Sequence, residues 1–210
     1  MFKPTGLLFY MKTIGYFGDS FCVSKKRDSW CVLLAQKLDL EIVHWGTGGA
    51  SIWNTMLEFN NTTAKPDVII FCWTNPNRLY HPTLPLTPNA VPIPAEDPQV
   101  FAAAESYYKY LQNDEKDKLA SRYALQWFDQ NELKPYEDSH KIIQMWSFKP
   151  FETANKDAGI KLSSGTFIDE SMFAFSKSAG EKDGWGVGTI NHMTVEQNQQ
   201  WADKVYSSMH

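Results

Sequence analysis

The chain has 210 residues, 43% of them hydrophobic and 21% charged, and a formal net charge of −4. This length suits one sizeable α/β domain and is short for two. The mildly acidic balance, with a sequence pI near 5.7, gives no electrostatic basis for binding nucleic acid or an anionic membrane. The composition is unusual only in its eight tryptophans, which would suit either a flat-ligand surface, such as one for carbohydrate, or extra core packing.

The amino-terminal region and the cysteines indicate in which cellular compartment the protein works. The apolar run at residues 6–11 is too short for a signal-peptide core, and no stretch approaches the length of a membrane span. Three cysteines without a C-x-x-C pair argue against a disulfide framework or a zinc knuckle. We therefore expect a cytoplasmic protein with no cofactor and no metal, although a processed secreted form would show the same features.

The first third of the chain predicts alternating strands and helices. A buried strand at residues 12–17 ends at a Gly-Asp-Ser turn, and a helix over 30–38 follows. A short strand at 41–45 precedes a helix over 51–63. Residues 68–73 form a continuous apolar run, which is typical of a strand buried on both faces of a parallel sheet.

The middle of the chain interrupts this pattern. Residues 75–98 hold seven of the eleven prolines and cannot form regular structure. Two helices are predicted after it, over 100–112 and 115–130. We interpret residues 77–139 as an insertion, a lid or a partner surface, within one domain that spans residues 1–210.

The sheet resumes at residues 141–146, residues 166–175 are apolar enough for some order, and Thr194 with Gln197 predicts a capping box that begins a last helix. This succession of strands and helices predicts an α/β fold. We expect a three-layer α/β/α sandwich with a mostly parallel, flavodoxin-like sheet and a helical insertion in its middle.

Residues able to do chemistry lie at the carboxyl ends of predicted strands or just before a helix, at 18–20, 46–49, 73–75 and 191–194. In a parallel sheet these ends converge on one crevice. A hydroxyl from Ser20, a glycine-rich turn, an amide from Asn75 and an imidazole from His192 would meet there. A serine nucleophile needs a base, and its tetrahedral oxyanion needs fixed N–H donors, so this set suits acyl transfer.

These stretches, in this order, resemble the four sequence blocks of the SGNH (GDSL-type) hydrolases. The resemblance implies Ser20 as the nucleophile, the Gly49 N–H and Asn75 as oxyanion donors, and His192 as the general base. It covers residues 12–75 and 185–206 of the chain.

The sequence departs from the family pattern at several positions. His44 stands where the family usually has Asn, and Trp73 and Pro76 replace the usual neighbours of the third-block Asn. Thr189 stands where the family has the Asp that orients the imidazole.

The missing acid leaves two interpretations open. Another carboxylate replaces it, with Asp183 favoured over Asp169 and Glu196, or the serine and histidine act as a dyad oriented by a backbone carbonyl.

The resemblance implies a serine esterase that hydrolyses short-acyl esters, with carbohydrate O-acetyl groups as a candidate substrate, through an acyl-enzyme at Ser20. Trp53 and Trp73 flank the oxyanion residues and are candidates either to line the substrate or to fill the crevice wall. The alternative is a non-catalytic SGNH-like module that binds a glycan or a partner. A thioesterase or peptidase is a third interpretation. The expected partner of the enzyme is a small-molecule or carbohydrate ester.

Overall fold

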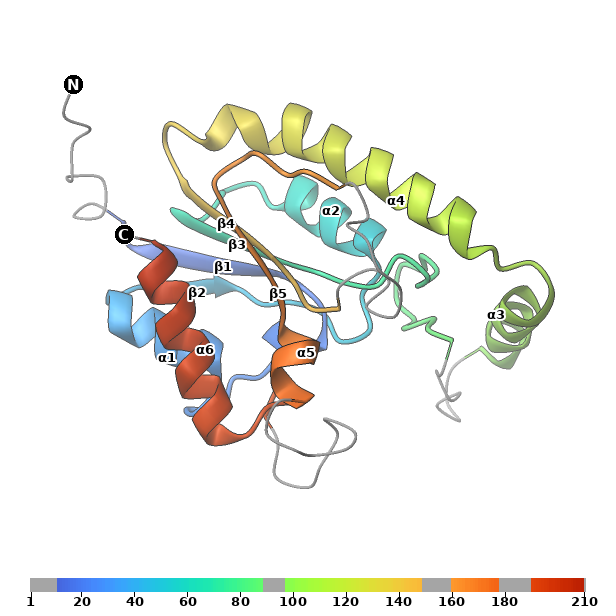
Figure 1. The fold of residues 1–210 in the computed structure, drawn as a ribbon, viewed down its shortest axis with the longest axis horizontal. Helices are drawn as coiled ribbons and strands as arrows, with labels where there is room; N and C mark the ends of the chain where they lie inside the picture. Colours follow the sequence, from blue (N-terminus) through green and yellow to red (C-terminus); the bar gives the residue numbers. More distant parts are fainter. Residues whose placement is uncertain (1–10, 89–96, 149–159, 178–189, 210) are drawn as a thin grey trace.

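The computed structural model describes residues 11–88, 97–148, 160–177 and 190–209. Five parallel strands form one sheet in the order β2-β1-β3-β4-β5 (Figure 1). Their bounds are Thr13–Gly18 (β1), Glu41–His44 (β2), Val68–Trp73 (β3), Lys141–Trp146 (β4) and Thr166–Ser171 (β5). This is the flavodoxin-like strand order, so the predicted α/β fold is confirmed.

Helices cover both faces of the sheet (Figure 1). The helices are α1 (Trp30–Leu38), α2 (Ile52–Asn61), α3 (Pro98–Tyr110), α4 (Asp114–Phe128), α5 (Met172–Lys177) and α6 (Val195–Ser208). One core cluster packs α1 and α6 against the sheet, and a second packs α2 and α4 against the opposite face. The three predicted layers are therefore present.

Strand β3 explains why both layers are needed. All six of its side chains are buried. Because successive side chains of a strand point to opposite faces, Val68, Ile70 and Cys72 pack in the first cluster. Ile69 and Phe71 pack in the second. A strand of this kind is stable only when helices cover both faces of the sheet.

Helix α4 belongs to the layer that covers the sheet, because Leu125 and Phe128 are buried in the second core cluster. Helix α3 lies farther out (Figure 1) and packs in a small third cluster with Leu86. Whether residues 77–139 act as a lid stays a prediction.

Strand β5 was the element least visible in the sequence, which indicated only some order there. It lies at the edge of the sheet, and Asp169 and Glu170 on it are exposed. Edge strands commonly carry such charges, which discourage pairing with other chains and weaken the apolar pattern.

Candidate active site

The side chains of Ser20 and His192 meet although 172 residues separate them, with Ser20 Oγ 2.8 Å from His192 Nε2. Ser20 lies two residues after the end of β1 and begins a short 3₁₀ helix, Ser20–Cys22, whose N-cap is Asp19. Both side chains are partly exposed, so a substrate can approach them. A serine hydroxyl at this distance from an imidazole nitrogen can transfer its proton to that nitrogen.

The turn that carries Ser20 is fixed by the residue before it. Asp19 is fully buried, and its Oδ1 accepts a hydrogen bond from the backbone N–H of Phe21 at 3.1 Å. The Trp30 indole N–H donates to the carbonyl of Phe21 at 2.7 Å and ties the turn to α1. Ser20 therefore sits on a constrained segment, as a nucleophile requires.

His192 is carried by a tight turn between Ile190 and Met193, which exchange backbone hydrogen bonds of 2.8 and 3.0 Å. Asn191 and His192 have φ values of 51° and 63°, the positive values that a two-residue turn of this type requires. A non-glycine residue in this region costs on the order of 1 kcal/mol or more. Such strain is common at functional sites.

Two asparagines offset this strain. Asn191 Oδ1 accepts from the backbone N–H of Ser24 at 3.0 Å, which joins the turn to the loop after Ser20. Asn198 is fully buried on α6, and its Nδ2 donates to the carbonyls of Ile190 at 2.9 Å and Met193 at 3.2 Å. These bonds hold the histidine turn against the serine turn.

Burial lowers the pKa of His192 below its ordinary value. The Asp19 carboxylate nearby raises the pKa, and the Arg78 guanidinium lowers it. The imidazole is therefore neutral near pH 7 and able to accept a proton.

The other two predicted blocks follow the strands on either side of β1. The N–H of Thr47 donates to the carbonyl of Gly18 at 2.9 Å and joins the glycine-rich turn to the end of β1. After β3, Asn75 Oδ1 accepts from the N–H of Asn77 at 2.9 Å. This bond engages the amide oxygen and leaves the Nδ2 group of Asn75 to act as a donor.

Gly49 lies in the left-handed region with a φ of 76°, and a Cβ added to it would be 2.2 Å from Pro85 Cβ. We expect Gly49→Ala to lower both stability and any activity of the site, since the backbone cost alone is roughly 1–2 kcal/mol and the loop would have to shift. Gly48→Ala is the matched control, because its Cβ would meet nothing within 4 Å. Urea unfolding midpoints of the two variants check this, and equal midpoints would contradict it.

The two tryptophans predicted beside the site are placed differently. The Trp73 side chain is fully buried; its ring stacks on Phe71 at 4.7 Å and its N–H donates to Gln144 Oε1 at 3.0 Å. Trp53 is 46% exposed. It borders an apolar groove of roughly 550 Å³ between α2 and α4, together with Trp127 and other residues.

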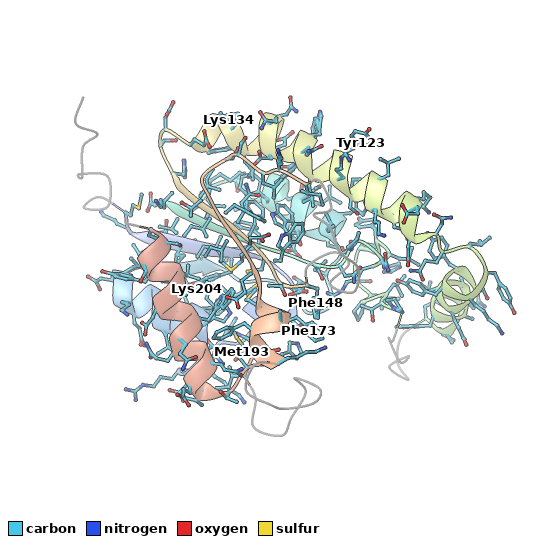
Figure 2. All side chains as sticks on the ribbon, viewed as in Figure 1. Tyr123, Lys134, Phe148, Phe173, Met193 and Lys204 are labelled. Atoms are coloured by element: carbon cyan, nitrogen blue, oxygen red, sulfur yellow. The ribbon has the colours of Figure 1, made fainter. Side chains whose placement is uncertain are left out.

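Beside the Ser20–His192 pair stands an aromatic cluster. The ring centroid of Phe21 is 4.9 Å from that of His192 and 5.3 Å from that of Phe148. Phe148 and Phe173 pack together with centroids 5.1 Å apart (Figure 2). This cluster gives the site an apolar wall that limits water at the imidazole.

Asp183, predicted as the acid, and Thr189 lie outside the described residues. Asp169 and Glu196, the other carboxylates considered, are exposed.

Sequence reasoning did not find Arg78 or Asn198. Neither has a local signal: Arg78 contacts Asp19, and Asn198 Oδ1 accepts from the backbone N–H of Trp30, 168 residues away, besides holding the nearby histidine turn. Within the described ranges, no three His, Cys, Asp or Glu side chains gather to hold a metal ion. No helix of the described part combines the length and hydropathy needed to cross a membrane.

No protein-family model matches the sequence, and no curated protein matches it. Among solved structures, the chain is similar to a protein described as a putative GDSL-like lipase from Parabacteroides merdae. The identity is 10% and the TM-score 0.48, with 94% of this chain and 95% of that chain covered. At this identity the likeness assigns no residue and no activity to the chain.

Proposed function

We propose that this protein is a serine esterase that hydrolyses short-acyl esters. The observation that supports this most is the 2.8 Å approach of Ser20 Oγ to His192 Nε2 at the carboxyl end of β1, an inner strand between β2 and β3. In open parallel sheets this edge is where ligands bind. Carbohydrate O-acetyl groups are the proposed substrate class, supported by the exposed ring of Tyr80, which lies in the same loop after β3 as Asn75 and on which a sugar ring could stack.

In the proposed mechanism, Ser20 Oγ attacks the ester carbonyl carbon while His192 Nε2 takes the hydroxyl proton. Backbone N–H groups of Ser20 and Gly49 and the amide of Asn75 stabilise the oxyanion. As the intermediate collapses, His192 gives the proton to the leaving alcohol and an acyl-enzyme remains. His192 then takes a proton from water, which attacks the acyl carbon. As this second intermediate collapses, the bond to Ser20 Oγ breaks, His192 returns the proton to Oγ, and the carboxylic acid product leaves. Asp183 stays the predicted acid, with a Ser20–His192 dyad oriented by a backbone carbonyl as the alternative.

A fluorophosphonate probe tests the nucleophile. We expect it to label Ser20 in the folded protein, as located by peptide mass spectrometry, and to leave Ser20→Ala unlabelled. Relative rates on p-nitrophenyl acetate, an acyl thioester and an amide then separate an esterase from a thioesterase or a peptidase. No labelling of a folded, monodisperse sample would reject the serine mechanism.

The rate of ester hydrolysis should depend on the protonation of His192. Only the neutral imidazole can accept the Ser20 proton, so kcat/KM falls as the pH drops through the pKa of His192. Because burial lowers that pKa, the fall should lie below about pH 6.5, the ordinary value for histidine. A pH profile of kcat/KM on p-nitrophenyl acetate checks this, and an acid limb above the ordinary value would contradict it.

A second candidate function is a binding module without chemistry. The exposed rings of Trp53, Tyr123 and Trp127 around the groove between α2 and α4 favour it. Such a module would bind an acetylated oligosaccharide saturably without releasing acetate, and Ser20→Ala would bind it as tightly as the unchanged chain. The esterase releases acetate from the same material.

A further inference from the structure

Arg78 lies in the loop after β3, yet its side chain is only 10% exposed. Its Nη1 is 3.2 Å from Asp19 Oδ2 and donates to the Ala50 carbonyl at 3.0 Å. Its backbone N–H donates to the Asn75 carbonyl at 3.4 Å. One residue therefore contacts all three segments that supply the proposed nucleophile and oxyanion donors.

The contact with Asp19 places a positive charge beside a buried carboxylate. Asp19 is fully buried, and its Oδ2 has no hydrogen bond of its own within the described residues. A buried carboxylate without a counter-charge is strongly destabilising. The Arg78 guanidinium is the cation beside that oxygen, so it neutralises a negative charge directly before the serine.

The contact with Ala50 fixes the glycine-rich turn. The Ala50 N–H donates to the Thr47 carbonyl at 3.0 Å, and the Ala50 carbonyl accepts from Arg78. Both the N–H and the carbonyl of Ala50, the residue after Gly49, are thus hydrogen-bonded. The guanidinium lies over the Phe148 ring, with its central carbon 5.0 Å from the ring centroid. This packing fixes the direction of the side chain.

We propose that Arg78 is a positioning residue of the site: it locks the Ser20, Gly49 and Asn75 segments into one arrangement and balances the charge of Asp19. This inference rests on the proposed esterase function and extends it to a residue from the proline-rich loop. A planar guanidinium can bridge the Asp19 carboxylate and the Ala50 carbonyl at once, whereas a lysine ammonium offers a single point charge.

The charge of Arg78 also acts on His192. Among the described residues, the charged groups that act on His192 are Asp19, which raises the pKa of the imidazole, and Arg78, which lowers it, in addition to burial. Loss of the guanidinium removes one of the two effects that lower the pKa of His192, while burial, the larger one, remains. The pKa of His192 should then rise, and the acid limb of the activity profile should move to higher pH.

The test compares Arg78→Gln, Arg78→Lys and the control Arg27→Gln, which removes an exposed arginine from the loop after Ser20, all in the full chain. For Arg78→Gln we expect kcat on p-nitrophenyl acetate to fall about 10²-fold, the typical effect of a small misplacement of reacting groups, with KM little changed and the acid limb at higher pH. In Arg78→Lys the positive charge remains, so the acid limb should lie at the pH of the unchanged chain, while kcat should still be lowered because the planar guanidinium is lost. Arg27→Gln should match the unchanged chain.

Titration of the His192 ring by NMR gives a readout that needs no turnover. If the unchanged chain hydrolyses no ester but Arg78→Gln still raises the pKa of His192, the esterase function fails and the electrostatic role of Arg78 stands. If the chain is an esterase and Arg78→Gln alters neither kcat nor the His192 titration, the role of Arg78 is rejected. If Arg78→Gln does not fold, Arg78→Lys decides: a lowered kcat at unchanged KM supports the inference, and unchanged kinetics overturn it.

Discussion

Ser20→Ala should lower kcat for ester hydrolysis by at least about 10³-fold, because knocking out the nucleophile of a serine hydrolase removes the covalent pathway. Binding groups and oxyanion donors remain, so KM should change much less than kcat. The measurement is kcat and KM on p-nitrophenyl acetate for purified, folded protein. The hydrogen bond lost to His192 contributes only about 1 kcal/mol to stability, so the urea unfolding midpoint should fall little.

Ser24→Ala is the matched control for this prediction. Its hydroxyl lies in the same loop as Ser20 and accepts from the N–H of Lys26, while the backbone N–H that anchors Asn191 is kept. Activity of Ser24→Ala should therefore equal that of the unchanged chain. Full activity of Ser20→Ala would show that another group is the nucleophile.

The second large effect is expected on stability. Asp129 is fully buried at the end of α4, and its carboxylate accepts five hydrogen bonds. The donors are the backbone N–H groups of Ser163 and Ser164, the Ser163 hydroxyl, and the side-chain amides of Gln130 and Gln144, at 2.7 to 3.1 Å. Gln144 on β4 also accepts from Trp73 on β3. One carboxylate therefore links the end of α4 to strand β4 of the sheet and to Ser163 and Ser164, which directly precede β5.

Asp129→Ala should destabilise the fold by about 3–5 kcal/mol, since it leaves buried donors without an acceptor. Because every partner donates, Asp129→Asn should not restore stability: its amide nitrogen would face donors. Urea unfolding, compared at equal m-values, gives the free-energy differences.

Asp138→Ala, at an exposed carboxylate in the loop before β4, should change the free energy of unfolding by no more than about 0.5 kcal/mol. A loss at Asp129 as small as this control would mean that the buried network contributes little.

Much of the secondary structure could be predicted because its signals are local. The N-caps Ser29 and Thr194 accept from backbone N–H groups three residues on, and side chains with this chemistry favour a helix start in any fold. The apolar run of β3 likewise predicts a strand buried on both faces. Strand β5 was missed because its edge position allows exposed charges.

The candidate site was predictable in part for a related reason. Ser20, Gly49 and Asn75 follow strands β1, β2 and β3, and parallel strands end at one edge of the sheet. Their grouping thus follows from the order of elements. The apolar run of β3 already indicates that Trp73 is buried, but its contacts with Phe128 and with Gln144 on β4 depend on tertiary packing.

The sequence by itself determined most of the elements, β5 excepted, and that a serine, glycines, an asparagine and a histidine follow strands or precede a helix. Only the tertiary structure decided that Ser20 and His192 come within 2.8 Å and that Arg78 joins Asp19. The physical reason is range: capping and periodicity act over a few residues. A contact between side chains 172 residues apart depends on strand order, register and packing, to which the whole chain contributes.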